Sequence, residues 1–234
     1  MKSWKTKSGY IVTLIMAGRS NVFLLSNGKQ NILIDTSVKR LRAKLLRRLE
    51  QANIHSIDYI ILTHAHFDHA ANANALKKKY NSKVIIHSEE AGYLSAGDNI
   101  VPEGTFIYSR IMMNLVGKRV FHWFCYEPCI PDLIVRSKFD LKEIGFNAYL
   151  IHSPGHTSGS MSLIVDDEIA IAGDSMFGIF KNSVFPPFAQ DADQMVRSWK
   201  VLLDTNCQAF FPSHGTAKSR MLLQKEYDLR KKEV

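Results

Sequence analysis

The chain begins with apolar residues that recur at about every second position, the period of a β-strand. Residues 10–16 and 21–26 follow this pattern on either side of Gly18 and predict the two arms of a hairpin. The apolar run NILIDT, residues 31–36, predicts a third strand. The first part of the chain is therefore expected to be rich in β-structure.

The apolar period then changes to that of a helix. Leu41, Leu45 and Leu49 lie on one face of a helix predicted over residues 38–53, and basic residues occupy the opposite face. A strand, a helix and a second strand are predicted next, at residues 58–63, 68–80 and 83–88. Strands that alternate with helices are typical of layered α/β folds.

Residues 89–142 lack a clear period. Prolines at 128 and 131 interrupt the interval, so no strand–helix repeat is predicted there. It is rich in aromatic residues and methionine, namely Phe106, Tyr108, Met112, Met113, Phe121, Trp123, Phe124 and Tyr126. We interpret it as an insertion that forms a lid, a pocket wall or a homodimer contact, because long insertions in compact domains are often functional.

Regular patterns return after residue 142. Strands are predicted at residues 147–153, 161–167, 168–175 and 209–215, and helices at residues 191–205 and from about residue 216 onward. Two stretches of similar strand-and-helix makeup therefore flank the irregular interval.

Length and composition favour one ordinary globular domain spanning residues 1–234. The chain has 46% apolar and 22% charged residues, enough for a single hydrophobic core. No apolar run approaches the length of a membrane span, and the first residues lack the apolar segment of a secretory signal. We therefore expect a cytoplasmic protein with no membrane partner. Three cysteines cannot form a fully paired disulfide framework.

The net charge of +8 favours a small-molecule substrate that is anionic. Much of the positive charge lies on the predicted helix at residues 38–53. Basic faces of this kind are common on solvated amphipathic helices, so a groove for nucleic acid is the less favoured interpretation.

Three of the nine histidines lie within six positions, directly after the strand predicted at residues 58–63. His64 and His66 are two residues apart, which places them on the same side of an extended chain. Asp68 and His69 follow where the chain turns into a helix, for which Asp68 is a suitable cap. Imidazole and carboxylate groups suit zinc, with iron and manganese as alternatives.

Three further candidate ligands lie downstream, each where an apolar run ends. His156 follows one predicted strand, Asp174 ends another, and His214 follows a third. Small residues beside them allow the backbone to approach closely. Because four residues cannot fill two metal sites, these three are expected to complete the set.

The motifs H-x-H-x-D-H (residues 64–69), P-G-H-T (154–157), G-D-S (173–175) and S-H-G (213–215) together resemble the metallo-β-lactamase superfamily of metallohydrolases. The resemblance implies an α/β fold of four layers, an αββα sandwich with two mixed sheets face to face and helices outside. It also implies a dinuclear metal site at one edge of the sandwich.

The resemblance further implies a role for each residue. One metal would be held by His64, His66 and His156, the second by Asp68, His69 and His214, with Asp174 as a bridge and Asp35 hydrogen-bonded to a ligand histidine to orient it.

The implied cofactors are two divalent cations, with Zn²⁺ favoured over Fe or Mn. Such a pair supplies a metal-bridging hydroxide at neutral pH and polarises a substrate oxygen. The predicted function is hydrolysis of a small ester, thioester or lactone, and Asp68 is the candidate that carries a proton to the leaving group.

Departures from subfamily patterns leave the substrate open. β-Lactamases of this superfamily generally have a cysteine where this chain has Asp174, and lactone-hydrolysing members have a tyrosine where it has Phe177. Glyoxalase II adds a C-terminal glutathione-binding region, whereas 20 residues follow His214 here. The alternatives are a nucleic-acid phosphodiesterase resembling ribonuclease Z and an iron-dependent sulfur dioxygenase.

Overall fold

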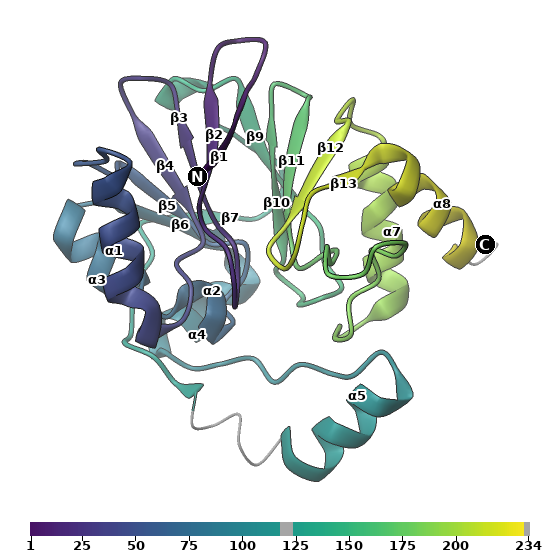
Figure 1. Cartoon of the computed structure of the whole chain (residues 1–234). Helices are drawn as coiled ribbons and strands as arrows, with labels where there is room; N and C mark the ends of the chain where they lie inside the picture. Colours follow the sequence, from purple (N-terminus) through teal and green to yellow (C-terminus); the bar gives the residue numbers. More distant parts are fainter. Residues whose placement is uncertain (118–123, 232–234) are drawn as a thin grey trace.

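The computed structural model describes residues 1–117 and 124–231, whose strands form two mixed sheets (Figure 1). In spatial order, the first sheet contains β1 (Lys2–Lys5), β2 (Ile11–Met16), β3 (Val22–Ser26), β4 (Asn31–Ile34), β5 (Tyr59–Ile61), β6 (Lys83–His87) and β7 (Leu133–Val135). The second contains β13 (Lys218–Ser219), β12 (Ala209–Pro212), β11 (Ile169–Gly173), β10 (Met161–Val165), β9 (Ala148–His152) and β8 (Phe139–Asp140). The first sheet is antiparallel from β1 to β4 and parallel from β4 to β7.

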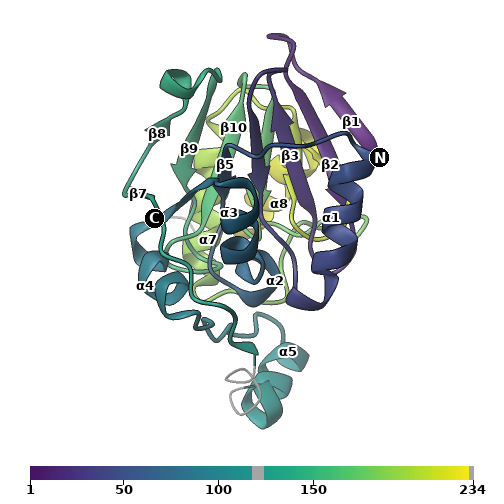
Figure 2. The ribbon, with the colours of Figure 1, turned by 90° about the vertical axis from the view of Figure 1, so that its left-hand side faces the viewer.

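Helices cover the outer face of each sheet. On the side of the first sheet lie α1 (Arg42–Gln51), α2 (Phe67–Ala70), α3 (Ala73–Tyr80) and α4 (Ser88–Ala96), as Figure 2 shows. On the side of the second sheet lie α7 (Ala192–Leu203) and α8 (Arg220–Arg230). The layers therefore follow the order helix, sheet, sheet, helix.

Side-chain alternation along the strands explains these layers. In β3, Phe23 and Leu25 belong to the apolar cluster between the sheets, whereas Leu24 belongs to the cluster shared with Leu45 of α1. Phe23 stacks on Phe211 of β12 in the opposite sheet, with ring centroids 5.7 Å apart. Because neighbouring side chains point to opposite faces, one strand serves two cores. The predicted αββα sandwich is thus confirmed.

Two predicted helices differ from the structure, one because it is divided and one because it begins later. The helix expected over residues 68–80 is divided into α2 and α3, and the break coincides with Asn72, whose buried side chain donates to the carbonyls of residues 36–38. The last helix begins at Arg220 rather than near residue 216, because residues 218–219 pair with β12 as β13.

Residues 89–142 contain more regular structure than their pattern predicted. Within this interval, α5 (Ile107–Met112) lies apart from the sheets at one end of the molecule, and β7 adds a parallel strand beside β6 (Figure 1). Strands β1, β7, β8 and β13 have four residues or fewer, too short to show a period in the sequence. Phe121 and Trp123 lie outside the described residues.

None of the helices within residues 1–117 and 124–231 is both long and apolar enough to cross a membrane.

A pair of stacked histidines links the two sheets. His87 ends β6 in the first sheet and is 2% exposed, and its ring lies 4.1 Å from that of His152 in β9 of the second sheet, at an interplanar angle of 12°. Burial, together with the neighbouring His152, lowers the pKa of His87 below 6.5. Because the folded-state pKa lies below the unfolded value, His87 stabilises the fold above about pH 6.5, and this contribution is lost as the pH falls.

We expect the variant His87→Asn to lose less stability between pH 7 and pH 5 than the wild-type protein, because asparagine does not take up a proton in this range. In the wild-type protein, the amide of Glu89 donates a hydrogen bond to His87 Nδ1 at 3.3 Å. The side-chain oxygen of asparagine can accept the same hydrogen bond. Urea unfolding at both pH values, with chelator present throughout, measures the difference. The variant His55→Asn, at an exposed position, is the control. Equal pH dependence in His87→Asn and wild type would contradict this account.

Candidate metal centre

The first cluster of candidate ligands lies in the connection from β5 to α2. His64 and His66 are in extended chain after the strand, and Asp68 and His69 are in the first turns of α2, all four of them buried. His66 is the residue that caps α2, and its side chain makes no cap hydrogen bond. Asp68 therefore does not cap the helix as the sequence predicted, and its carboxylate is directed instead toward His69 and His214.

The remaining candidates come from the second sheet. His156 lies in the loop after β9, Asp174 directly follows β11, and His214 follows β12. Gly155 has a φ of +129°, and a Cβ there would lie 2.2 Å from the backbone nitrogen of Met195. Only glycine allows this loop to approach α7 so closely. Both sheets thus direct their ligand-bearing loops to one end of the sandwich.

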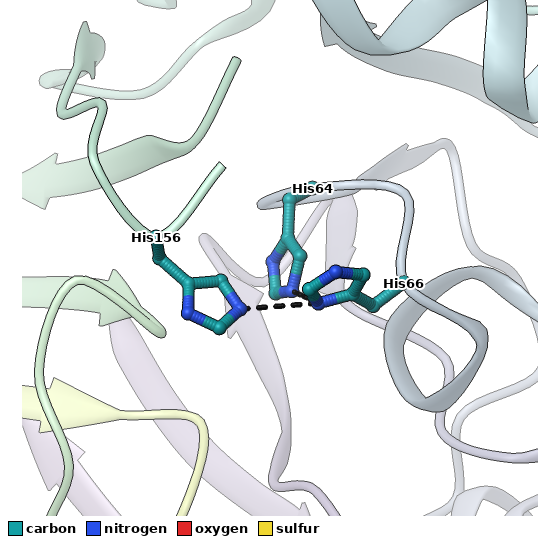
Figure 3. A group of neighbouring side chains, drawn as sticks. All are labelled: His64, His66 and His156. Atoms are coloured by element: carbon teal, nitrogen blue, oxygen red, sulfur yellow. Dashed lines mark hydrogen bonds between the residues drawn. The ribbon is translucent and has the colours of Figure 1, made fainter. Parts of the chain in front are cut away.

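Three histidine nitrogens face one another at this end (Figure 3). His66 Nδ1 lies 2.9 Å from His64 Nε2 and 3.1 Å from His156 Nε2. His156 Nδ1 donates to the carbonyl of Phe188 at 2.9 Å, so a neutral His156 has a lone pair on Nε2. His64 is assigned the same tautomer, because Thr63 Oγ1 donates to Asp35 and therefore accepts from His64 Nδ1 at 3.0 Å.

Asp174 lies between this group and a second one. Its carboxylate oxygens are 3.5 Å from His156 Nε2, 3.2 Å from His214 Nε2 and 3.7 Å from His69 Nε2. Asp68 closes the second group, 3.6 Å from His214 Nε2 and 3.8 Å from His69 Nε2. The structure thus brings all seven candidate residues together around one small volume.

Asp35 supports the candidate ligands through hydrogen bonds. Its carboxylate accepts hydrogen bonds from His69 Nδ1 at 2.8 Å, from the backbone amide of Thr63 at 2.8 Å and from the hydroxyl of Ser213 at 3.0 Å. It therefore links the chain segments that carry His64, His69 and His214. The bond to Nδ1 leaves His69 Nε2 directed at Asp174.

Another buried carboxylate near the centre, Glu90, was not predicted from the sequence. Its two oxygens accept the amides of Ala65 at 2.9 Å and Gly159 at 3.1 Å, and the hydroxyl of Tyr126 donates to the carbonyl of Ala65 at 2.7 Å. Ala65 separates His64 from His66, so these contacts hold the histidine segment in place. Only the fold reveals this role, because in the sequence Glu90 lies in the interval 89–142, where no helix or strand period was found.

Electrostatics divides the histidines into two classes. Burial and the neighbouring imidazoles hold the pKa of His64 and of His66 well below 6.5, so both are neutral near pH 7. Burial alone would lower the pKa of His69 too, but the carboxylates of Asp35, Asp174 and Asp68 raise it to about 10. The acidic residues therefore favour positive charge near His69.

The arrangement fits a cation. His69 Nε2 and Asp174 Oδ1 are buried and have no hydrogen-bond partner among the described residues, although they lie 3.7 Å apart. Three groups of side chains each place their ligand atoms within 4.8 Å of one another, namely His64, His66 and His156; His64, His69 and Asp174; and Asp68, His69 and His214. Neutral imidazole and carboxylate in such proximity are consistent with a metal site.

A cavity of about 480 Å³ opens onto this group. Five candidate ligands line it, namely His66, Asp68, His156, Asp174 and His214. Its apolar wall includes Met112 at the end of α5, Met113 directly after it, and Phe177 and Phe188 from the loop that follows β11. The cavity therefore has the size and the apolar lining of a small-molecule site.

Comparison with known proteins agrees with this geometry. A probable metallo-hydrolase of Methanocaldococcus jannaschii is 29% identical over 206 residues, which cover 86% of this chain and 90% of the relative. A hydroxyacylglutathione hydrolase of Pelagibacter ubique is 28% identical over 166 residues, covering 70% of this chain and 54% of the relative.

Solved structures show the same fold. A crystal structure of an archaeal metallo-beta-lactamase superfamily protein from Sulfolobus tokodaii aligns with a TM-score of 0.63 at 22% identity, covering 92% of this chain and 82% of that one. Residues 15–214 match the metallo-beta-lactamase superfamily, a region that contains every candidate ligand. The chain therefore belongs to the metallo-beta-lactamase superfamily and is a probable metal-dependent hydrolase.

Proposed function

We propose that this protein is a dinuclear zinc-dependent hydrolase of a small ester, thioester or lactone. The observation that carries the proposal is the position of Asp174, whose carboxylate contacts His156 on one side and His69 and His214 on the other. In the proposed assignment, one cation would be held by His64, His66 and His156 and the second by Asp68, His69 and His214, with the carboxylate of Asp174 between the two groups.

Two bound divalent cations would lower the pKa of a coordinated water and polarise the substrate oxygen. The side chains supply the rest of the chemistry. Asp68 lines the cavity with its side chain 12% exposed, so it can pass a proton to the oxygen or sulfur that leaves. Met112, Met113 and Phe188 would exclude water from the opposite side of the substrate.

Size and lining favour a small acyl compound. Phe177 packs its ring 4.6 Å from that of His214, so this position offers an apolar contact to the substrate and no proton donor. The name of the Pelagibacter ubique relative, a hydroxyacylglutathione hydrolase, supports including thioesters among the candidate substrates.

Substitution His66→Ala is expected to reduce turnover of an ester and thioester panel by at least about a hundredfold, because it removes one nitrogen from a three-histidine group. Chelation should abolish the activity and added zinc should restore it. The matched control His55→Ala removes an exposed histidine and should retain activity.

Metal analysis of the same preparations tests the cofactor assignment, with an expected content near two zinc ions per chain. Unchanged turnover in His66→Ala would contradict the proposed centre. Iron content together with oxygen consumption on sulfur compounds would favour the dioxygenase alternative.

Substitution Asp35→Asn is expected to weaken zinc binding by roughly 10- to 100-fold, because the amide cannot hold the Nδ1 proton of His69 as a carboxylate does. Turnover at saturating zinc should largely recover, because Asp35 orients His69 and does not itself contact the substrate. Competition with a chromophoric chelator measures the affinity. The control Asp58→Asn alters a carboxylate directly before β5 that accepts the backbone amide of Asn31, whereas the candidate ligands lie beyond the other end of that strand. Equal zinc affinity in Asp35→Asn and wild type would rule out the positioning role.

A further inference from the structure

A second cavity adjoins the metal centre. It has a volume of about 420 Å³, and Arg19 and Phe67 line both this cavity and the one at the metal centre. Its wall also includes Lys39, Arg40 and Phe124, and its lining contains no carboxylate among the described residues. Three cations therefore line a cavity that shares part of its wall with the proposed catalytic cavity.

The basic side chains in this wall have no carboxylate of the described residues within hydrogen-bond distance, unlike Lys78 on the adjoining surface. Within the part of the chain that the structure describes, Lys39 and Arg40 are exposed and form no salt bridge. Arg19 is 54% exposed and approaches Asp68 only to 3.9 Å, beyond hydrogen-bond distance. On the adjoining surface, by contrast, Lys78 contacts Glu127 at 3.1 Å. The donors of the three cavity cations thus remain available to a ligand.

The backbone around these cations is anchored to the metal centre. Lys39 and Arg40 follow residues 36–38, whose carbonyls all accept hydrogen bonds from the side chain of Asn72, and Thr36 donates its amide to the carbonyl of His69 at 2.7 Å. Arg19 precedes Ser20, whose hydroxyl donates to the carbonyl of Asp68. The cations therefore have a fixed position relative to the candidate ligands.

The aromatic wall adds an apolar surface beside the charges. Phe67 and Phe124 stack with ring centroids 4.6 Å apart, and the guanidinium of Arg19 lies 5.6 Å from the centre of the Phe67 ring. A flat apolar wall beside several cations suits an organic anion better than a free inorganic ion, because the rings can bury its carbon skeleton.

We propose that this second cavity, which we call the cationic subsite, binds a carboxylate or phosphate group on one half of the substrate while the scissile bond lies at the metal centre. The inference rests on the proposed hydrolase function and narrows its substrate class to anionic esters and thioesters. In the reaction, one water adds across the C–O or C–S bond, and a carboxylic acid and an alcohol or thiol are released. The cationic subsite takes no part in bond cleavage and acts on substrate affinity.

The kinetic test uses two thioesters with the same acyl group, one with a neutral thiol half and one whose thiol half carries a phosphate. In the double variant Lys39→Ala/Arg40→Ala, kcat/KM for the anionic thioester should fall about tenfold further than for the neutral one, mainly through KM. Arg19 is left unchanged because its guanidinium lies 3.9 Å from Asp68, a candidate metal ligand, so its loss could also disturb the metal centre.

The control is the double variant Lys44→Ala/Arg47→Ala, which removes the same charge from exposed positions of α1 outside the cavity. It should affect both thioesters alike. Equal losses on the two thioesters in Lys39→Ala/Arg40→Ala, or the same discrimination in both double variants, would overturn the cationic subsite.

A binding measurement separates this proposal from the hydrolase proposal. Calorimetric titration with phenyl phosphate, before and after chelation of metal, should show about tenfold weaker binding in Lys39→Ala/Arg40→Ala than in wild type and no change in Lys44→Ala/Arg47→Ala. If wild-type protein hydrolyses none of the thioesters, the hydrolase function fails, and this titration still decides whether the subsite exists. Binding that is equal in all three proteins would refute it.

Discussion

The structure depends on burying imidazole and carboxylate groups whose polar atoms the protein does not fully pair. His69 Nε2 and Asp174 Oδ1 are both enclosed and lack a hydrogen-bond partner among the described residues. Leaving a buried polar atom unpaired costs about 1–3 kcal/mol, more for a charged group. An arrangement that accumulates such costs in one place is understandable where a bound cation supplies the missing interactions, which is the basis of the function we propose.

The αββα sandwich places these polar groups at the end of the sheets, so they do not interrupt the apolar layers. The strands contribute apolar residues to the layers, while the loops that leave them carry the ligands. Each loop is held by further buried contacts: Asp35 links three ligand-bearing segments, and Glu90 holds the amides of Ala65 and Gly159. Rigid support of this kind keeps flexible loops in the geometry that metal binding requires.

Two adjoining cavities suggest how chemistry and recognition are separated. The cavity at the metal centre combines candidate ligands with an apolar wall, whereas the neighbouring one combines three cations with stacked rings. Arg19 and Phe67 belong to both. In the proposed arrangement, the first cavity acts on the scissile bond and the second selects the rest of the substrate, so variation in the loops around the second can change specificity without disturbing the ligands.

The sequence by itself determined the fold class and the set of residues that converge. Strand periods are visible in local patterns, and histidines and aspartates at strand ends are informative because carboxyl ends of neighbouring strands meet at one edge. It could not reveal Glu90 as a support of His64 and His66, nor the division of residues 68–80 into two helices. These features, like the cavity lined by residues 19, 39 and 40, arise from contacts between segments distant in the chain. Only the tertiary structure decided them, because no local period encodes which segments meet.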